Sequence, residues 1–316
     1  MTLLREISPE EIESLISVAA LIPAMREALK AEAQGEVEVP LRAFWGLQGD
    51  FGILAMPARS SSLGRAIFKF LTLVDSNRAL GLPGVMGELT LLDAVTGAAM
   101  ARLPAENVTL LRTAACSAVA TQLLAHPDAD SLVLFGSGPQ AAHHAEAMLG
   151  VRPIKRVMVQ GRDRGRAEKL AAKLAARFGI ETAIGPDGIF LREAMILCTT
   201  TNATQILFED FEIHPEAHIN AVGAYRPDMK ELPATLLREA AIFADSVQPV
   251  AREAGDLLAA FGDPDTVSRQ IRAIGELVIN PLARRPKGRT VYKSVGNAGQ
   301  DLYASAAILE KLAALT

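Results

Sequence analysis

Hydrophobic and polar positions change their spacing along the chain. Between residues 37 and 96, short apolar runs are broken by Gly, Pro, Asp and Asn, a pattern that predicts short strands joined by turns, and DAVTG (93–97) predicts a hairpin turn. After residue 127, apolar runs alternate with helical segments such as 166–178, whose apolar residues recur at three- and four-residue offsets. This alternation predicts a parallel sheet covered by helices on both faces.

Several helix boundaries can also be predicted. Ser8 followed by Pro-Glu-Glu is a typical helix start. Further helices are expected over 22–35, ending at Gly35, and over about 110–125, where small residues share one face. A final strand, TVYKSVG, precedes a closing helix that we expect to return to the first domain.

Composition excludes several classes of protein. A chain of 316 residues usually forms two domains, and 50% hydrophobic with 22% charged residues is ordinary for a globular protein. The net charge of −4 comes without a basic stripe, so nucleic acid is not an expected partner. No apolar run approaches the roughly 20 residues of a membrane span. Cys116 and Cys198 lie in apolar stretches, which predicts buried thiols and a cytoplasmic location.

A glycine motif follows the first strand of the second region. In LVLFGSGPQA, Gly136, Gly138 and Ala141 form G-x-G-x-x-A between a predicted strand and a predicted helix. A plain tight turn would look the same. With a second strand about 20 residues on, the context favours a dinucleotide whose pyrophosphate meets the helix N-terminus.

The end of that second strand indicates which dinucleotide binds. An NAD site usually carries Asp or Glu there for the ribose hydroxyls, but this chain reads VMVQGRDRGR. Arg162 and Arg164 can pair with a 2′-phosphate, so we predict NADPH. In the alternative, both arginines are solvated and Asp163 takes the ribose role, which leaves NADH possible.

Isolated cations lie inside apolar segments of the first region: Arg42, Lys69 and Arg112. Each alone is compatible with a side chain that reaches the surface. If all three converge, a small carboxylate ligand would supply the opposing charge.

The strings RTAACSAVAT, VLFGSGPQA, INAVGAYRPDMKEL and YKSVGNAGQDL, with AMPARS and FKFLTLV, resemble the ornithine cyclodeaminase and mu-crystallin family over nearly the whole chain. The resemblance implies an α/β protein and a homodimer. A Rossmann NAD(P)-binding domain is then expected at 121–291. An α+β substrate-binding and dimerisation domain is expected at 1–120 with 292–316.

The resemblance also assigns residues. Arg42, Lys69 and Arg112 resemble the family's carboxylate-binding cations. Other positions resemble its cofactor contacts: Thr113, Gly136, Ser137, Gly138, Pro139, Gln140, Thr200, Val222, Gly223 and Ser294.

Departures from the family pattern narrow the expected reaction. Cyclodeaminases carry an aspartate where this chain has Tyr225 and a glutamate where it has Leu54, so ornithine deamination is disfavoured. The GAYRPDMKEL form resembles the ketimine reductases. We therefore predict NADPH-dependent reduction of 1-pyrroline-2-carboxylate or 1-piperideine-2-carboxylate to L-proline or L-pipecolate. Lys69, Asp228 or a water supplies the proton, although Asp228 also suits a turn or helix cap.

Other functions stay open at this point. An alanine-type amino-acid dehydrogenase would need the same cations and cofactor, and ornithine cyclodeaminase remains an alternative. A further alternative is not an enzyme but a binding protein of mu-crystallin type, which would bind NADPH and a small ligand. His214 and His218 have metal-ligand spacing, but Pro215 between them makes a helix doubtful, and we predict no metal.

Overall fold

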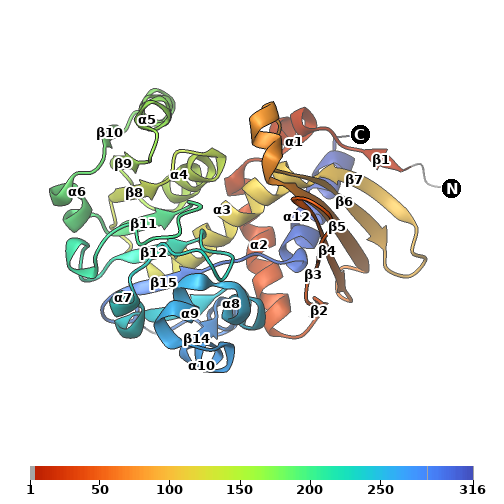
Figure 1. The fold of residues 1–316 in the computed structure, drawn as a ribbon. Helices are drawn as coiled ribbons and strands as arrows, with labels where there is room; N and C mark the ends of the chain where they lie inside the picture. Colours follow the sequence, from red (N-terminus) through yellow and green to blue (C-terminus); the bar gives the residue numbers. More distant parts are fainter. Residues whose placement is uncertain (1–3, 283, 316) are drawn as a thin grey trace. The chain divides into compact units, whose positions relative to one another are not determined.

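The computed structural model describes residues 4–282 and 284–315, without the side chain of Arg78. It divides into two compact units, Met1–Arg112 with Asn297–Thr316 and Thr113–Gly296, which we call unit one and unit two (Figure 1). Each unit is described separately.

Unit one is built on a mostly antiparallel sheet in the order β1-β7-β6-β5-β4-β2, with β3 paired to β4. Only the β1–β7 pair among these described strands is parallel. The strands are β1 (Arg5–Glu6), β2 (Val37–Glu38), β3 (Ala43–Gly46), β4 (Phe51–Ser60), β5 (Arg65–Val74), β6 (Val85–Asp93) and β7 (Ala99–Pro104), with the 3₁₀ helix η1 (Asp75–Leu80). The predicted hairpin turn is confirmed, since Asp93 Oδ1 accepts from the amides of Val95 and Thr96.

The helices of unit one are α1 (Pro9–Leu15), α2 (Val18–Ala33), the first part of α3 (Ala105–Leu124) and α12 (Ala298–Ala313). Ser8 and Glu11 form a reciprocal capping box, which confirms the predicted start of α1. Two helices begin earlier than predicted. Ser17 caps α2, and α3 begins at Ala105, because Pro104 directly precedes it and no Gly or Pro interrupts the next turn.

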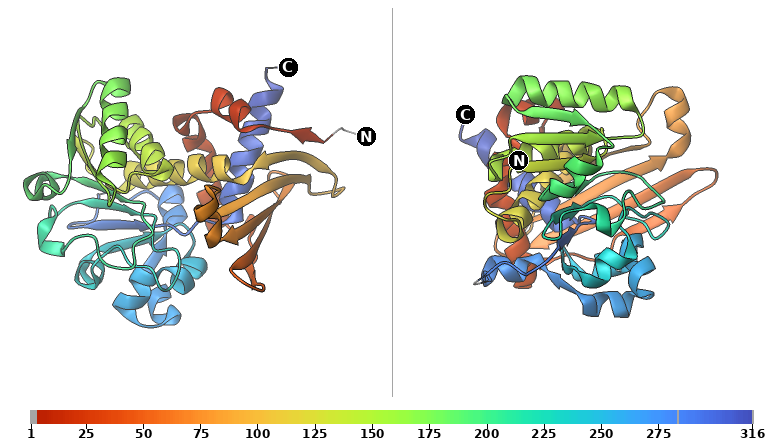
Figure 2. Two further views of the ribbon diagram at one scale, coloured as in Figure 1. Left: turned by 45° about the horizontal axis from the view of Figure 1, so that its top comes forward. Right: turned by 90° about the vertical axis from the view of Figure 1, so that its left-hand side faces the viewer.

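Helix α12 lies against β4 and β5, although more than two hundred residues separate them in sequence (Figure 2). Side chains alternate across this sheet, so Lys69 on β5 faces α12, whereas Phe68 and Phe70 point to the other side. That outer face is apolar and exposed. Trp45 lies on it with 51% of its surface exposed, so this residue is not part of the core of unit one.

Unit two contains a parallel sheet in the order β10-β9-β8-β11-β12-β15-β13-β14. The strands are β8 (Ser131–Phe135), β9 (Arg156–Gln160), β10 (Glu181–Ile184), β11 (Ile196–Thr199), β12 (His218–Ala221), β13 (Ala241–Ala244), β14 (Ile271–Ala273) and β15 (Thr290–Lys293). The helices are α4 (Pro139–Val151), α5 (Arg164–Phe178), α6 (Gly188–Glu193), η2 (Asp210–Glu212), α7 (Ala234–Glu239), α8 (Val247–Glu253), α9 (Gly255–Phe261), α10 (Pro264–Gln270) and α11 (Ile274–Ile279). The predicted α/β class with a parallel sheet is confirmed.

Both faces of this sheet are buried by helices. Val133 and Phe135 pack with apolar side chains of α6, α7, α8 and α9 in one core. On the opposite face, Asn220 Nδ2 donates to Thr121 Oγ1 of α3 at 2.9 Å. Burial on both sides explains why the strands read as continuous apolar runs in the sequence.

Both cysteines are buried free thiols, as predicted. Among the helices within residues 4–282 and 284–315, none combines the length and apolar character needed to cross a bilayer.

Candidate functional site

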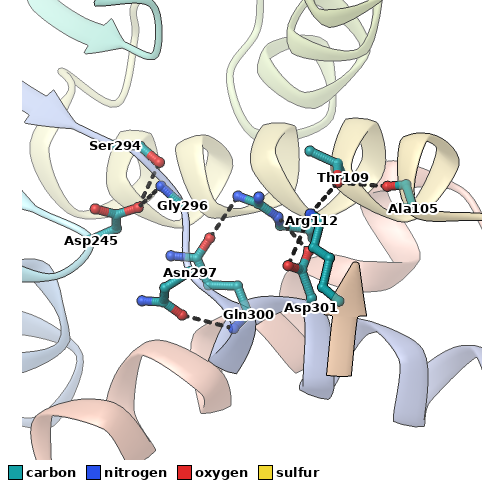
Figure 3. Close-up of polar contacts among 10 residues, drawn as sticks. Ala105, Thr109, Arg112, Asp245, Ser294, Gly296, Asn297, Gln300 and Asp301 are labelled. Atoms are coloured by element: carbon teal, nitrogen blue, oxygen red, sulfur yellow. Dashed lines mark hydrogen bonds and ion pairs between the residues drawn. The ribbon is translucent and has the colours of Figure 1, made fainter. Parts of the chain in front are cut away.

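A buried cluster in unit one joins a strand to two helices. Lys69 Nζ on β5 lies 3.0 Å from Asp301 Oδ2 on α12, and Arg112 Nε on α3 lies 2.9 Å from Asp301 Oδ1. Figure 3 shows Arg112 and Asp301 pointing toward one another. The side chains of Lys69, Arg112 and Asp301 are 3%, 5% and 0% exposed. The structure therefore brings together two of the predicted cations.

The charges in this cluster do not balance. Burial lowers the pKa of Lys69 to about 8, opposed by Asp301 and reinforced by the nearby positive charges of Arg112 and Arg42. Burial alone would raise the pKa of Asp301, but Lys69 and Arg112 hold it below its usual range. Lys69 and Arg112 carry two positive charges and share the one negative charge of Asp301, a formal sum of +1. This excess suits a small anion that brings its own carboxylate.

Sequence reasoning missed three members of this cluster. Asp301 and Gln300 lie in the closing helix, and Gln300 Oε1 accepts from Arg112 Nη1 at 2.9 Å. Thr109 Oγ1 accepts from Lys69 Nζ at 2.7 Å and donates to a backbone carbonyl one turn earlier. The sequence offered only a weak signal for Asp301, namely a charged residue that directly precedes the apolar segment 302–309. Its partners are 189 and 232 residues away.

In unit two, the predicted glycine turn lies between β8 and α4. Gly136 directly follows β8 with φ +117°, and a Cβ there would lie 2.7 Å from Thr200 Oγ1. Gly138 is the N-cap of α4, with no side chain capping the helix and open space where a Cβ would be. Among the described residues, Gln140 Oε1 is a buried atom without a hydrogen-bond partner. A helix start without a side-chain cap and an unsatisfied polar atom fit a dinucleotide.

The end of β9 distinguishes the predicted arginines. Arg162 is exposed, whereas Arg164 Nε already bonds Glu168 Oε1 at 2.9 Å. Asp163 caps α5 by accepting from the amide of Arg166 at 3.0 Å. One oxygen of Asp163 is thus occupied by the helix, which weakens its alternative role on a ribose.

Val222, Gly223 and Ser294, three further predicted cofactor residues, follow the carboxyl ends of β12 and β15. The amides of Val222 and Gly223 donate to Thr199 O at 2.9 and 3.0 Å. Ser294 Oγ, after β15, donates to Asp245 Oδ2 at 2.7 Å (Figure 3). Thr113, the first residue of unit two, is buried on α3. Open parallel sheets bind ligands at the carboxyl edge of their strands.

Asp228 lies in a different setting from the cations. Its side chain is 63% exposed and pairs with Arg226, two residues away, at 3.1 Å. It does not cap the following helix, whose N-cap is Pro233. Its role as a proton donor stays a prediction.

The model of the ornithine cyclodeaminase/mu-crystallin family matches residues 6–315. The chain belongs to this family. Over 305 residues, covering 95% of this chain and 94% of the relative, it is 32% identical to "Ketimine reductase mu-crystallin" of Mus musculus. Family membership confirms the resemblance seen in the sequence motifs.

Solved family structures share the whole fold. The Thermococcus litoralis Delta(1)-pyrroline-2-carboxylate reductase, in complex with NADH and L-proline, is 28% identical with a TM-score of 0.91, over 99% of this chain and 98% of that one. An archaeal alanine dehydrogenase dimer with bound NAD is 27% identical with a TM-score of 0.91, over 99% and 97%.

His218, which the sequence analysis considered as a metal ligand, is buried at the start of β12. Its Nδ1 lies 2.9 Å from Thr290 Oγ1 and its Nε2 lies 3.3 Å from Asn220 Oδ1. Burial lowers the pKa of His218 to about 3, so the ring is neutral. Within the described part of the chain, no group of His, Cys, Asp and Glu side chains is placed to hold a metal ion.

Proposed function

We propose that this chain is an NADPH-dependent reductase of cyclic 2-carboxy imines, 1-pyrroline-2-carboxylate or 1-piperideine-2-carboxylate, and that it forms L-proline or L-pipecolate. The observation that carries the proposal is the buried Lys69–Asp301–Arg112 cluster with its excess positive charge. A protein that only stored cofactor would not need this costly arrangement of buried ions. The named activities of the relatives, ketimine and pyrroline-2-carboxylate reduction, support it.

The cations have separate tasks in this proposal. Arg112 and Arg42 attract and orient the substrate carboxylate through their positive charges. Lys69 adds a charge that is mostly present at neutral pH, because its pKa is about 8. The same value makes it a competent acid for the imine nitrogen, alongside Asp228 or a water. Orienting the reactants can contribute roughly 7–11 kcal/mol.

The cofactor is assigned to unit two. When bound, a reduced nicotinamide supplies the hydride that the imine carbon accepts. The turn Gly136–Gln140 and the amides that open α4 would hold the pyrophosphate. Residues at the carboxyl ends of the strands, namely Thr200, Val222, Gly223 and Ser294, would line the nicotinamide, with Thr113 as a further contact.

The preference for NADPH rests on Arg162. Family structures with NADH and NAD support a nicotinamide cofactor in general. Arg162→Ala should raise the KM for NADPH and leave the KM for NADH unchanged. Arg164→Ala is the matched control, with a smaller effect because Arg164 already pairs with Glu168. Equal changes in the KM for NADPH and the KM for NADH would contradict the preference for NADPH.

A homodimer is the proposed assembly. The outer face of the unit-one sheet exposes Trp45, Phe68, Phe70 and Met86 at 36–51% of their surface. A contiguous exposed apolar face is typical of an interface, and the related alanine dehydrogenase is described as a dimer. A cytoplasmic location stays a prediction from the buried thiols.

The deciding experiment measures oxidation of NADPH with each imine, with pyruvate plus ammonia, and with NADH in parallel. Turnover of the imines that is lost in Arg112→Ala would support imine reduction and the role of Arg112 in binding the substrate carboxylate. Turnover of pyruvate with ammonia would instead favour the alanine-type activity, a second candidate supported by the likeness to alanine dehydrogenase. NADPH binding without any turnover would contradict both and favour the binding protein. Release of ammonia from ornithine would identify a cyclodeaminase.

A further inference from the structure

Unit two contains a buried ionic cluster of its own, made of other residues than the Lys69–Asp301–Arg112 cluster of unit one. Glu231 is completely buried in the segment between β12 and α7. Its Oε2 accepts from Thr199 Oγ1 at 2.6 Å, and its Oε1 accepts from both the amide and the hydroxyl of Thr201 at 2.7 Å. One carboxylate thereby holds the end of β11 and the first residues of the loop that follows it.

The same carboxylate supports the turn after β12. A Cβ at Gly223 would lie 2.2–2.4 Å from the carboxylate atoms of Glu231, so the backbone of this turn rests directly on it. The amide of Gly223 also donates to Thr199 O at 3.0 Å. The β11 loop and the β12 turn therefore share one support.

A lysine and a second carboxylate fix Glu231 from the other side. Asp256 Oδ1 accepts from the amide of Glu231 at 2.6 Å, and Asp256 Oδ2 lies 3.2 Å from Lys293 Nζ, in a pair that is 0% exposed. Lys293 Nζ also donates to the carbonyl of Gly223. Burial raises the pKa of Glu231, and Lys293 opposes this rise most strongly.

The placement of this cluster indicates a purpose beyond folding. Burying ionised groups costs several kcal/mol per ion, and well-packed apolar side chains often stabilise a core as well or better. The core of the sheet is apolar at Val133, Leu197 and Ile219. The ionic cluster lies instead under the carboxyl edge, where ligands of such sheets bind. Its hydrogen bonds end on Thr199 and Thr201, on either side of Thr200, and on Gly223, and both Thr200 and Gly223 are assigned to the nicotinamide.

We propose that Glu231 is a positioning residue, which holds the loop at Thr199–Thr201 and the turn at Gly223 in one arrangement so that the nicotinamide ring binds in a single orientation. This inference rests on the proposed function. Glu231 does not touch the reactants. It acts through the backbone that it supports, and the hydrogen bonds of its carboxylate described above go to Thr199 and Thr201, not to the pyrophosphate turn at Gly136–Gln140.

The test uses Glu231→Gln, which keeps the size of the side chain but loses a charge and one acceptor oxygen. Thr290→Val is the matched control, because it removes a buried hydrogen bond to His218 at the start of β15, the opposite edge of the same sheet. The readouts are NADPH affinity and emission anisotropy from nicotinamide fluorescence, kcat and KM, and the stereospecificity of transfer from C4-deuterated NADPH.

We expect Glu231→Gln to bind NADPH within about threefold of the wild-type affinity, since the pyrophosphate carries most of it. Its kcat should fall at least about tenfold, because small misplacements of reacting groups are costly. The bound nicotinamide should be more mobile and its stereospecificity reduced, whereas Thr290→Val should change neither.

Each outcome has a distinct meaning. If the wild-type protein neither binds NADPH nor turns over an imine, the proposed function fails and the inference falls with it. If the wild type is active but Glu231→Gln matches Thr290→Val in kcat, anisotropy and stereospecificity, the inference alone is overturned. Should Glu231→Gln not fold, Thr201→Val removes one hydrogen bond to the carboxylate. Unchanged stereospecificity in that variant would also overturn the proposal.

Discussion

Replacing Asp301 with Asn tests the reasoning about the clamp most directly. The substitution keeps the shape of the side chain but removes the carboxylate that Lys69 and Arg112 share at 3.0 and 2.9 Å. Both cations are almost fully buried and would face a neutral amide. Removing one partner of a buried pair costs about 3–5 kcal/mol, because the remaining charge is left without compensation. We expect Asp301→Asn to lose this much unfolding free energy near neutral pH.

This cost should depend on pH in a specific direction. Asp301 is the largest influence that raises the pKa of Lys69, which is about 8 in the wild type. In the variant the pKa of Lys69 falls further below its ordinary value of 10.5. As pH rises through the variant's pKa, the folded variant releases a proton that the unfolded chain keeps, so its stability increases. The difference in unfolding free energy between the wild type and the variant should therefore become smaller between about pH 6 and pH 8.

The assay is urea unfolding at both pH values, followed by the fluorescence of Trp45. This residue is the single tryptophan of the chain, and it reports on unit one. Glu88→Gln is the control, because its pair with Arg102 is exposed and contributes little. A loss of unfolding free energy below about 1 kcal/mol, or a difference from the wild type that grows as pH rises, would refute this account of the Lys69–Asp301–Arg112 cluster.

Further predictions concern the pH profile, the cofactor turn and the dimer. In a pH series, kcat/KM for the imine should fall as pH rises through about 8, when Lys69 loses its proton. The fall in kcat should occur at higher pH, because the bound substrate carboxylate raises the pKa of Lys69. If kcat and kcat/KM fall at the same pH, Lys69 does not contact the substrate carboxylate. Gly136→Ala should weaken NADPH binding at least about tenfold in fluorescence titrations, because positive φ and the nearby Thr200 hydroxyl exclude a methyl group. Gly179→Ala, also at positive φ but in open space, should bind NADPH with the wild-type affinity. Equal losses of NADPH affinity in both variants would point to general strain. Phe68→Glu should sediment as a monomer, and a persistent dimer would place the interface elsewhere.

Local pattern was enough to predict much of the fold. Alternating apolar runs and helical periodicity identified the parallel sheet, since burial on both faces leaves a continuous apolar signal in each strand. Local chemistry located the start of α1 at Ser8 and the hairpin turn at Asp93, where a side chain satisfies amides a few residues away. The glycine turn at Gly136 was also readable, because its geometry depends on residues adjacent in sequence.

Long-range partnership was decided only by the tertiary structure. The sequence singled out Lys69 and Arg112 as cations in apolar segments, but nothing near them in the chain identifies Asp301, which reaches them only because α12 packs against β5. Glu231 was likewise unremarkable within RPDMKEL until folding buried it under Gly223. Periodicity records whether a position is buried, because burial repeats along an element. It does not record which distant charge meets it, because that contact is made once, by the packing of whole elements.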